Sequence, residues 1–336
     1  MAEIVLGMWT THGPTLATTP DQWASRLKAD LSRNHWFRGE ELSFDELVER
    51  REEEAISQKH TLDERKRRYD ACQSAIDILT REWETVDPDV CVILGNDQHE
   101  IFLEDVQPTF TIYHGENFYN LPLTDAQKKL LPPGIEEAEW SYRPESYTEY
   151  AGAPQLAATV FEQAMEDGFD VAASNEWPTR DNHRHVGTPH AFSFILRRIM
   201  RDKTVPTLPV IANTFFPPNQ PTARRCFEFG GMIRRAILRW DSDARVAVVG
   251  SGGMSHFCID EELDHRFLNA LNRRNADDIC GIEQGLLQSG SSELRNWIVA
   301  AGVLFDTELS GEIIDYVPCY RSDAGTGTAN GFVCWK

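Results

Sequence analysis

The chain of 336 residues carries 53 acidic and 33 basic residues, for a formal net charge of −20. A surface this negative repels phosphate backbones, so we expect no nucleic-acid partner. The absence of any run of 18 apolar residues excludes a membrane-spanning helix, and we expect no membrane partner. Seven scattered cysteines and an N-terminus without the layout of a signal peptide favour a reduced, cytoplasmic protein.

Strand and helix patterns alternate along the whole sequence. The predicted strands cover residues 4–9, 90–94, 109–113, 170–174, 205–212, 246–249, 313–320 and 331–335. The predicted helices cover residues 20–31, 69–85, 149–166, 191–200, 222–239, 261–272 and 290–302. This alternation predicts an α/β fold, in which residues 1–336 form a single domain with a central, mostly parallel sheet covered by helices.

Two segments interrupt the alternation. Residues 35–70 are highly charged, and we interpret them as a solvated helical insertion that forms a lid or a subunit contact. Residues 116–145 contain several aromatic residues and a Pro-Pro-Gly turn, and we expect them to be irregular.

Histidines follow several of the predicted strands. His12, His99 and His256 each lie in the glycine-containing turn that follows a predicted strand, and the loop at 182–190 contributes three further histidines. The carboxyl ends of parallel strands meet at one edge of a sheet, where α/β proteins bind their ligands. The sequence therefore predicts a metal or proton-transfer site at this edge. Two histidines and one carboxylate with open positions would suit a non-haem Fe(II) site, although spacing alone cannot establish it.

Several motifs resemble those of one enzyme family. They are His12-Gly13, the segment 95–102, Pro209 to Asn213, Arg224 to Phe227 with Arg234 to Ala236, Gly250-Ser-Gly-Gly-Met-Ser-His256, Gly290 to Leu294 and the tail 316–328. Together they resemble the class III extradiol ring-cleaving dioxygenases of the protocatechuate 4,5-dioxygenase β-subunit superfamily. The tail and the Asp-Gln-His-Glu segment look most like those of 3-O-methylgallate 3,4-dioxygenases.

The resemblance implies a role for individual residues. It implies that His12, a histidine after Asn96-Asp97 and Glu293 bind Fe(II). An ungapped alignment places Gln98 on the second of these positions. We assign the position to His99, because a neutral imidazole binds Fe(II) better than an amide oxygen does and a strand-end bulge absorbs a one-residue shift.

Two further histidines would complete the catalytic site. By the same resemblance, His256 is the catalytic acid and base, and His185 is a catalytic residue beside the metal or the substrate. The implied reaction is Fe(II)-dependent extradiol cleavage of a catechol-type aromatic acid, similar to 3-O-methylgallate, by O₂. We assign recognition of the substrate carboxylate to Arg321 and Ser322 in the tail loop, because a guanidinium binds a carboxylate through two hydrogen bonds.

Other interpretations remain open at this stage. Glu293 could stabilise the N-terminus of its own helix, and His12 could be an ordinary loop histidine. The substrate could be another aromatic diol, such as gallate, protocatechuate or a dihydroxypyridine. The protein could also be a non-redox metallohydrolase with zinc, or a metal-free binding protein. We expect a homo-oligomer, with a dimer as the expected form.

Overall fold

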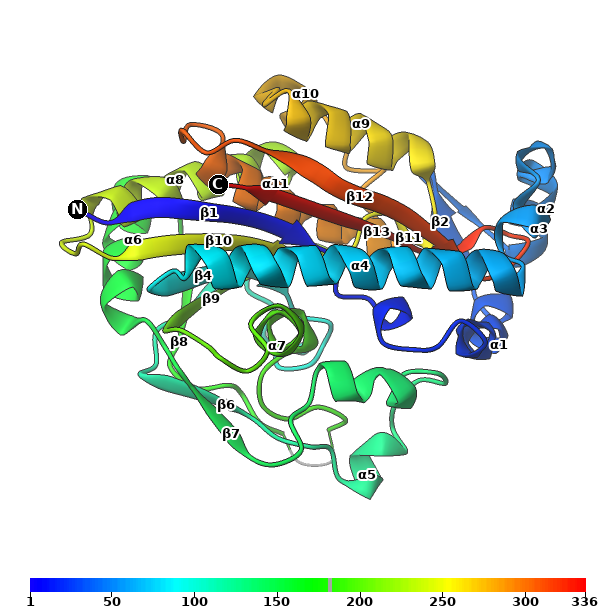
Figure 1. Cartoon of the computed structure of the whole chain (residues 1–336), viewed down its shortest axis with the longest axis horizontal. Coiled ribbons are helices and arrows are strands. Elements are labelled where there is room, and N and C mark those ends of the chain that lie inside the picture. Colours follow the sequence, from blue (N-terminus) through cyan, green and yellow to red (C-terminus); the bar gives the residue numbers. More distant parts are fainter. Residues whose placement is uncertain (181–182) are drawn as a thin grey trace.

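A central mixed sheet organises the molecule. The computed structural model describes residues 1–180 and 183–336. The strands of the sheet are β1 (Glu3–Thr10), β4 (Val90–Asn96), β5 (Phe110–Tyr113), β8 (Ala172–Ser174), β9 (Thr207–Ala212), β10 (Arg245–Ser251), β11 (His256–Cys258), β12 (Gly311–Tyr320) and β13 (Thr326–Trp335). Their order is β11-β13-β1-β10-β4-β9-β5-β8, and β12 pairs with β13 (Figure 1).

The centre of this sheet is parallel. Strands β1, β10, β4 and β9 run in one direction, so that the last residues of all four lie at the same edge. The C-terminal hairpin of β12 and β13 joins antiparallel to β1, and β5 joins antiparallel to β9. The predicted single-domain α/β fold with a mostly parallel sheet is therefore confirmed.

Helices cover both faces of the sheet. Side chains of a strand alternate between faces, so Val246 and Val248 of β10 belong to one apolar core while Ala247 and Val249 belong to the other. The first core includes α6 (Pro154–Glu166), α8 (Ala223–Arg239) and α11 (Leu294–Leu304). The second includes α4 (Leu62–Val86) and α7 (His190–Phe194), and Figure 1 shows α4 crossing in front of the sheet.

The charged segment 35–70 differs from the predicted solvated helix. It contains a hairpin of β2 (His35–Phe37) and β3 (Glu40–Leu42), followed by α2 (Phe44–Arg50) and α3 (Ile56–Lys59). Phe37 and Leu47 form a small apolar core with Cys258 and Ala324. The charge pattern conceals these few apolar anchors, which attach the segment to the main body.

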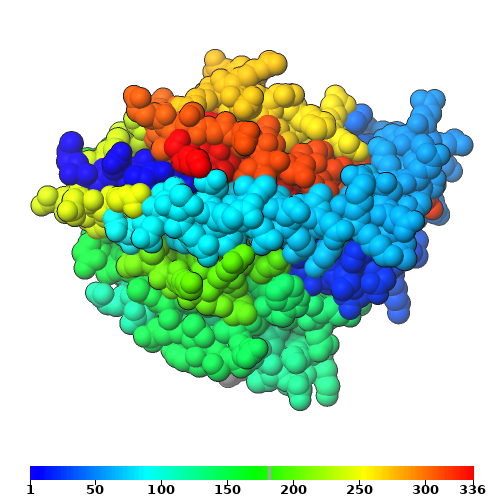
Figure 2. Space-filling view, viewed as in Figure 1, coloured from blue at the N-terminus to red at the C-terminus, as the bar shows by residue number. Residues whose placement is uncertain are grey.

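The segment 116–166 also has more structure than its sequence indicates. A second hairpin, β6 (Asn117–Asn120) with β7 (Thr148–Ala151), encloses α5 (Asp125–Lys128) and a 3₁₀ turn at Glu136–Ser141. The predicted helix 149–166 begins only at Pro154, a residue suited to the first helical turn. In Figure 2 this green part of the chain lies on the opposite side of α4 from the red C-terminal strands.

The remaining helices follow the predictions with local changes. The expected helix 20–31 is a 3₁₀ turn at Gln22–Arg26 followed by α1 (Leu27–Leu31), and the expected helix 191–200 is α7 followed by a π-helical turn at Ile195–Ile199. Helix α9 (Glu261–Asn272) packs on β12, and α10 (Ala276–Cys280) packs on α9 and α8. Within the described ranges, none of the helices has the length and apolar character needed to cross a bilayer.

Close packing of α8 on α11 gives a test of this architecture. A methyl group at Gly230 would overlap the backbone of Val299, whereas one at Gly231 would lie 3.6 Å from the flexible end of Arg235. We expect Gly230→Ala to lower the free energy of unfolding by about 1–3 kcal/mol, as overpacking does. Gly231→Ala should leave it unchanged or raise it by up to about 1 kcal/mol. Urea unfolding of both variants measures the difference, and equal stabilities would contradict the packing.

Candidate metal centre and substrate cavity

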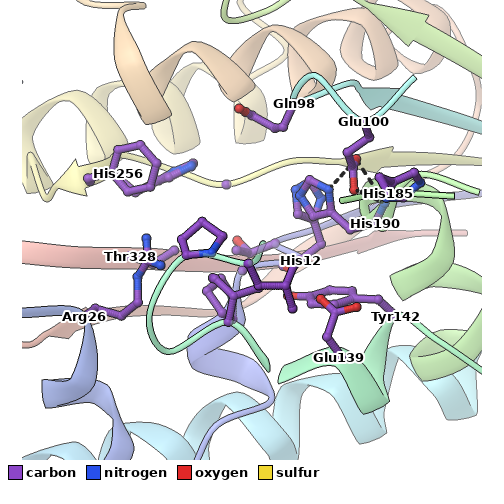
Figure 3. Close-up of a pocket in the computed structure, with 18 of the residues that line it drawn as sticks. His12, Arg26, Gln98, Glu100, Glu139, Tyr142, His185, His190, His256 and Thr328 are labelled. Carbon is purple, nitrogen blue, oxygen red and sulfur yellow. Dashed lines mark hydrogen bonds and ion pairs between the residues drawn. The ribbon is translucent and has the colours of Figure 1, made fainter. Parts of the chain in front are cut away.

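A cavity of about 210 Å³ opens at the carboxyl edge of the parallel strands. Its lining includes four histidines and three carboxylates. The strands β4 and β10 that end at this edge consist largely of apolar residues, so the polar groups stand out from their surroundings. The histidines are His12, His185, His190 and His256, and the carboxylates are Glu100, Glu139 and Glu293. Figure 3 labels the four histidines together with Glu100 and Glu139, which come from both halves of the chain.

Glu293 is the most strongly held of the acidic groups. It precedes α11 and is 3% exposed, and its side chain turns away from its own helix. Oε2 accepts a hydrogen bond from the Gly253 amide at 2.7 Å, while Oε1 accepts from Asn96 at 3.2 Å and Gln98 at 3.1 Å. These donors come from the ends of β4 and β10, so the carboxylate joins three elements instead of stabilising one helix N-terminus.

Electrostatics keep Glu293 ionised. Burial alone would raise the pKa of this carboxyl, but the His12 and His256 imidazoles outweigh burial and hold the pKa well below its usual range. The Nε2 atoms of these two histidines lie 3.3 Å and 3.7 Å from the carboxylate oxygens.

His12 faces this carboxylate with a lone pair. The Ser251 hydroxyl donates to the Ala191 carbonyl at 2.6 Å, so the same oxygen accepts from Nδ1 of His12 at 2.9 Å. Burial lowers the pKa of His12 despite the nearby Glu293, which favours the neutral form of the ring. Its Nε2 is buried and has no hydrogen-bond partner among the described residues. Two acceptors 3.3 Å apart repel each other unless a cation or a proton lies between them.

His190 completes a set of metal-binding atoms. Its Nδ1 lies 2.7 Å from Oε2 of Glu100, and a proton donated there leaves the Nε2 lone pair free. Candidate ligand atoms of His12, His190 and Glu293 all lie within 4.8 Å of one another. Two imidazoles and one carboxylate are the donors of non-haem Fe(II) sites, so the residues present fit this metal.

The structure corrects the position of one predicted ligand. His99 does not join the cluster: its ring stacks on Phe216 with centroids 3.5 Å apart, and its Nε2 lies 2.7 Å from Nε2 of Gln107. His99 has a positive φ of 54°, a conformation that sequence patterns do not reveal. Gln98 points into the cavity beside Glu293, and His190 occupies the place in the cluster that we assigned to His99.

Glu100 connects His190 to the second predicted catalytic histidine. Its other oxygen lies 3.0 Å from Nδ1 of His185. Burial would raise the pKa of Glu100, but His190 and His185 hold it well below the usual range. Burial lowers the pKa of His185 to about 4 despite this carboxylate. The structure thus places His185 beside a candidate ligand, and it adds Glu100, which sequence reasoning missed.

His256 lies on the other side of Glu293. Its Nδ1 donates to the Met254 carbonyl at 2.8 Å, so Nε2 is the atom directed toward Glu293. Burial would lower its pKa, but Glu293 reverses the shift and raises it. A side chain at Gly253 would overlap the His256 ring, which explains why a glycine is needed before this histidine.

The predicted carboxylate-binding residues are already engaged. Arg321 lines the cavity, but its guanidinium donates two hydrogen bonds to Asp30, at 2.6 Å and 2.9 Å. The Ser322 hydroxyl lies 2.6 Å from that of Thr326, and Ser322 is not among the residues that line the cavity. The geometry does not favour either residue for the role we assigned.

The cavity wall comes from an unexpected part of the chain. Leu123, Leu131, Pro132, Ile135 and Tyr142 line it, all from the segment between β6 and β7. In the described structure, none of the residues 35–70 lines this cavity. The segment predicted to be irregular therefore covers the site, and the charged segment predicted as a lid does not.

Comparison with known proteins identifies the family. Residues 62–327 match the catalytic LigB subunit of aromatic ring-opening dioxygenase. The chain belongs to this family. The LigB match extends from the start of α4 to the start of β13 and thus includes His190, His256 and Glu293, while His12 precedes it.

Two curated relatives agree with this assignment. The chain is 33% identical over 94 residues to gallate dioxygenase of Pseudomonas putida, which is 25% of this chain and 28% of that protein. It is 25% identical over 171 residues to 2,3-dihydroxyphenylpropionate/2,3-dihydroxicinnamic acid 1,2-dioxygenase of Comamonas testosteroni, which is 50% of this chain and 43% of that protein. Each match covers less than half of the relative's own length.

The contact between Glu100 and His190 gives a test of the candidate centre. We expect Glu100→Gln to weaken Co(II) and Fe(II) binding about 10- to 100-fold, because loss of the carboxylate removes the acceptor that orients His190. Glu104→Gln, an exposed glutamate in the same loop, serves as the control. Anaerobic titration against a chromophoric chelator measures both affinities. Equal affinities in the two variants would contradict the role given to Glu100.

Proposed function

We propose that this LigB-family protein is an Fe(II)-dependent extradiol dioxygenase that opens the ring of a catechol-type aromatic acid with O₂. The observation that carries the proposal is the buried cluster of His12, His190 and Glu293 at one side of a cavity. The family match and the two dioxygenase relatives give independent support.

The donor set determines what a metal could do in this cavity. His12, His190 and Glu293 would hold Fe(II) on one face, and the bound metal would supply open positions for both a diol and O₂. The ionised Glu293 needs no proton loss before it binds a cation, and the lowered pKa of His12 favours the neutral ring that binds a metal. Glu100 outweighs burial and raises the pKa of His190, so a metal would compete with a proton for that ring.

His256 supplies the proton chemistry. Its Nδ1 proton is held by the Met254 carbonyl, so Nε2 is the atom that can accept a proton from a substrate hydroxyl and later return it. Glu293 outweighs burial and raises the pKa of His256, so this ring holds a proton more strongly than a free imidazole does. His185 would act through Glu100 on the orientation of His190.

The cavity limits the size of the substrate. A protein cavity of about 150 Å³ holds a benzene ring, so a cavity of about 210 Å³ suits one substituted ring. The apolar wall of Leu123, Leu131 and Ile135 would contact the ring face. We propose a single-ring acid similar to 3-O-methylgallate as substrate, with gallate and protocatechuate as the nearest alternatives.

Reconstitution with different metals tests the proposal. The anaerobically prepared Fe(II) protein should consume O₂ with a panel of methoxylated and carboxylated catechols, and a ring-opened product should absorb in the near ultraviolet or visible range. The Zn(II) form should not consume O₂. Hydrolytic activity of the Zn(II) form without O₂ uptake by the Fe(II) form would contradict the proposal.

Two histidine variants test which residues bind the metal. We expect His190→Ala to weaken Fe(II) binding by at least about 100-fold and to abolish O₂ uptake, because it removes one of three ligands. His99→Ala removes an imidazole from the loop that carries Glu100 and should change the affinity by less than about threefold, because His99 stacks on Phe216 outside the cluster. The reverse order of effects would restore His99 as the ligand.

A further inference from the structure

Three arginines gather around a single carboxylate at one side of the cavity. Asp30 is completely buried. The charges of Arg33 and Arg321 act on Asp30 and on Arg26, and the charge of Arg321 also acts on Arg33. The cluster holds three positive charges and one negative charge. Such an excess is notable in a chain with 20 more acidic than basic residues.

Asp30 already has its partners. Arg321 binds both of its oxygens, the Thr326 hydroxyl donates to it at 2.8 Å, and Arg33 lies 3.3 Å away. Arg33 also stacks over Phe257 at 4.1 Å, which fixes its guanidinium outside the cavity lining. The carboxylate therefore has no oxygen left for Arg26.

Two arginines that line the cavity, Arg26 and Arg184, form no ion pair among the described residues, and Arg26 is the one whose charge interacts with those of Arg321 and Arg33. It lines the cavity from the 3₁₀ turn at Gln22–Arg26, and its Nη1 donates to the Pro133 carbonyl at 2.9 Å. None of the described carboxylates forms an ion pair with it. Burial, together with Arg321 and Arg33, lowers its pKa to about 10, so Arg26 remains charged at pH 7 in an environment that disfavours its charge.

We propose that Arg26 binds the carboxylate of the aromatic substrate and thereby selects acids over neutral diols. This inference rests on the proposed function, and it names the substrate class for the same site. A partly buried guanidinium next to two others is stabilised by an incoming anion, and its planar donors match a carboxylate. Arg321, whose donors Asp30 occupies, would raise the local positive potential instead of binding the substrate.

The placement of Arg26 also orients the ring. In Figure 3, Arg26 lies on the side of Thr328 and His256, while Glu100, His185 and His190 lie on the other side of the view. A carboxylate on Arg26 would direct the opposite end of the ring toward the cluster of His12, His190 and Glu293. The two hydroxyl groups would then lie at the ring positions remote from the carboxylate.

Calorimetry with two matched probes tests the proposal. Anaerobic Fe(II) protein is titrated with 3,4-dihydroxybenzoate and with 4-methylcatechol, which differ in the carboxylate. We expect Arg26→Gln to weaken binding of the acid about 10- to 100-fold more than binding of the neutral diol, because a charge-assisted hydrogen bond is lost. Lys28→Gln removes an exposed positive charge from the next turn and should leave this ratio unchanged.

The outcomes separate this proposal from the proposed function. O₂ uptake with both probes, together with equal losses of affinity in Arg26→Gln, overturns the role of Arg26 and leaves the dioxygenase assignment intact. Selective loss of the acid without O₂ uptake by the wild type supports Arg26 as the carboxylate site of a protein with another activity. A wild-type protein that binds the two probes equally, or binds neither, overturns the role of Arg26.

Discussion

An ionised carboxylate in a protein interior requires partners on every side, and Glu293 shows how this requirement shapes the molecule. Desolvation of a charge costs several kcal/mol unless hydrogen bonds and opposite charges offset it. Gly253, Asn96 and Gln98 provide the donors, and they lie at the ends of β10 and β4. The parallel register that aligns Gly250 with Leu94 therefore also brings these donors to one carboxylate. A change that shifted either strand would leave a buried charge without its partners.

The same constraint extends across the cavity through a second carboxylate. Glu100 accepts a hydrogen bond from His190 and lies 3.0 Å from Nδ1 of His185, while Arg143 lies 2.6 Å from that same Nδ1. Acidic and basic groups thus alternate from one wall of the cavity to the other, and Glu100 holds His190 with its Nδ1 proton directed away from the cluster. The geometry of the metal-binding atoms is consequently set by contacts in which no metal participates. Such preorganisation allows a cation to bind without a large rearrangement.

The sequence predicts those parts of the site that strand ends position directly. His12 and His256 follow buried strands, and periodicity locates such strands well, so both histidines lie at the expected edge. The assignment of His99 in preference to Gln98 did not consider His190, because the position of each side chain depends on how its loop turns. His99 adopts a positive φ, and His190 begins a short helix that directs it toward His12. Neither conformation produces a periodic pattern of apolar residues that could be read from the sequence. The prediction for segment 35–70 was wrong for a similar reason, because a few apolar residues among many charged ones decide how the segment packs.

Net charge and local charge act on different length scales in this cavity. The net charge of −20 repels an aromatic acid at a distance, but salt reduces such repulsion beyond about 8 Å at physiological ionic strength. Arg26 is partly buried, so its guanidinium would interact with an anion at a lower effective dielectric than in bulk water. The short-range attraction is therefore the stronger term once the substrate has entered. An acidic protein can in this way select an acidic ligand, provided that its arginines are gathered where the ligand binds and its carboxylates there are already paired.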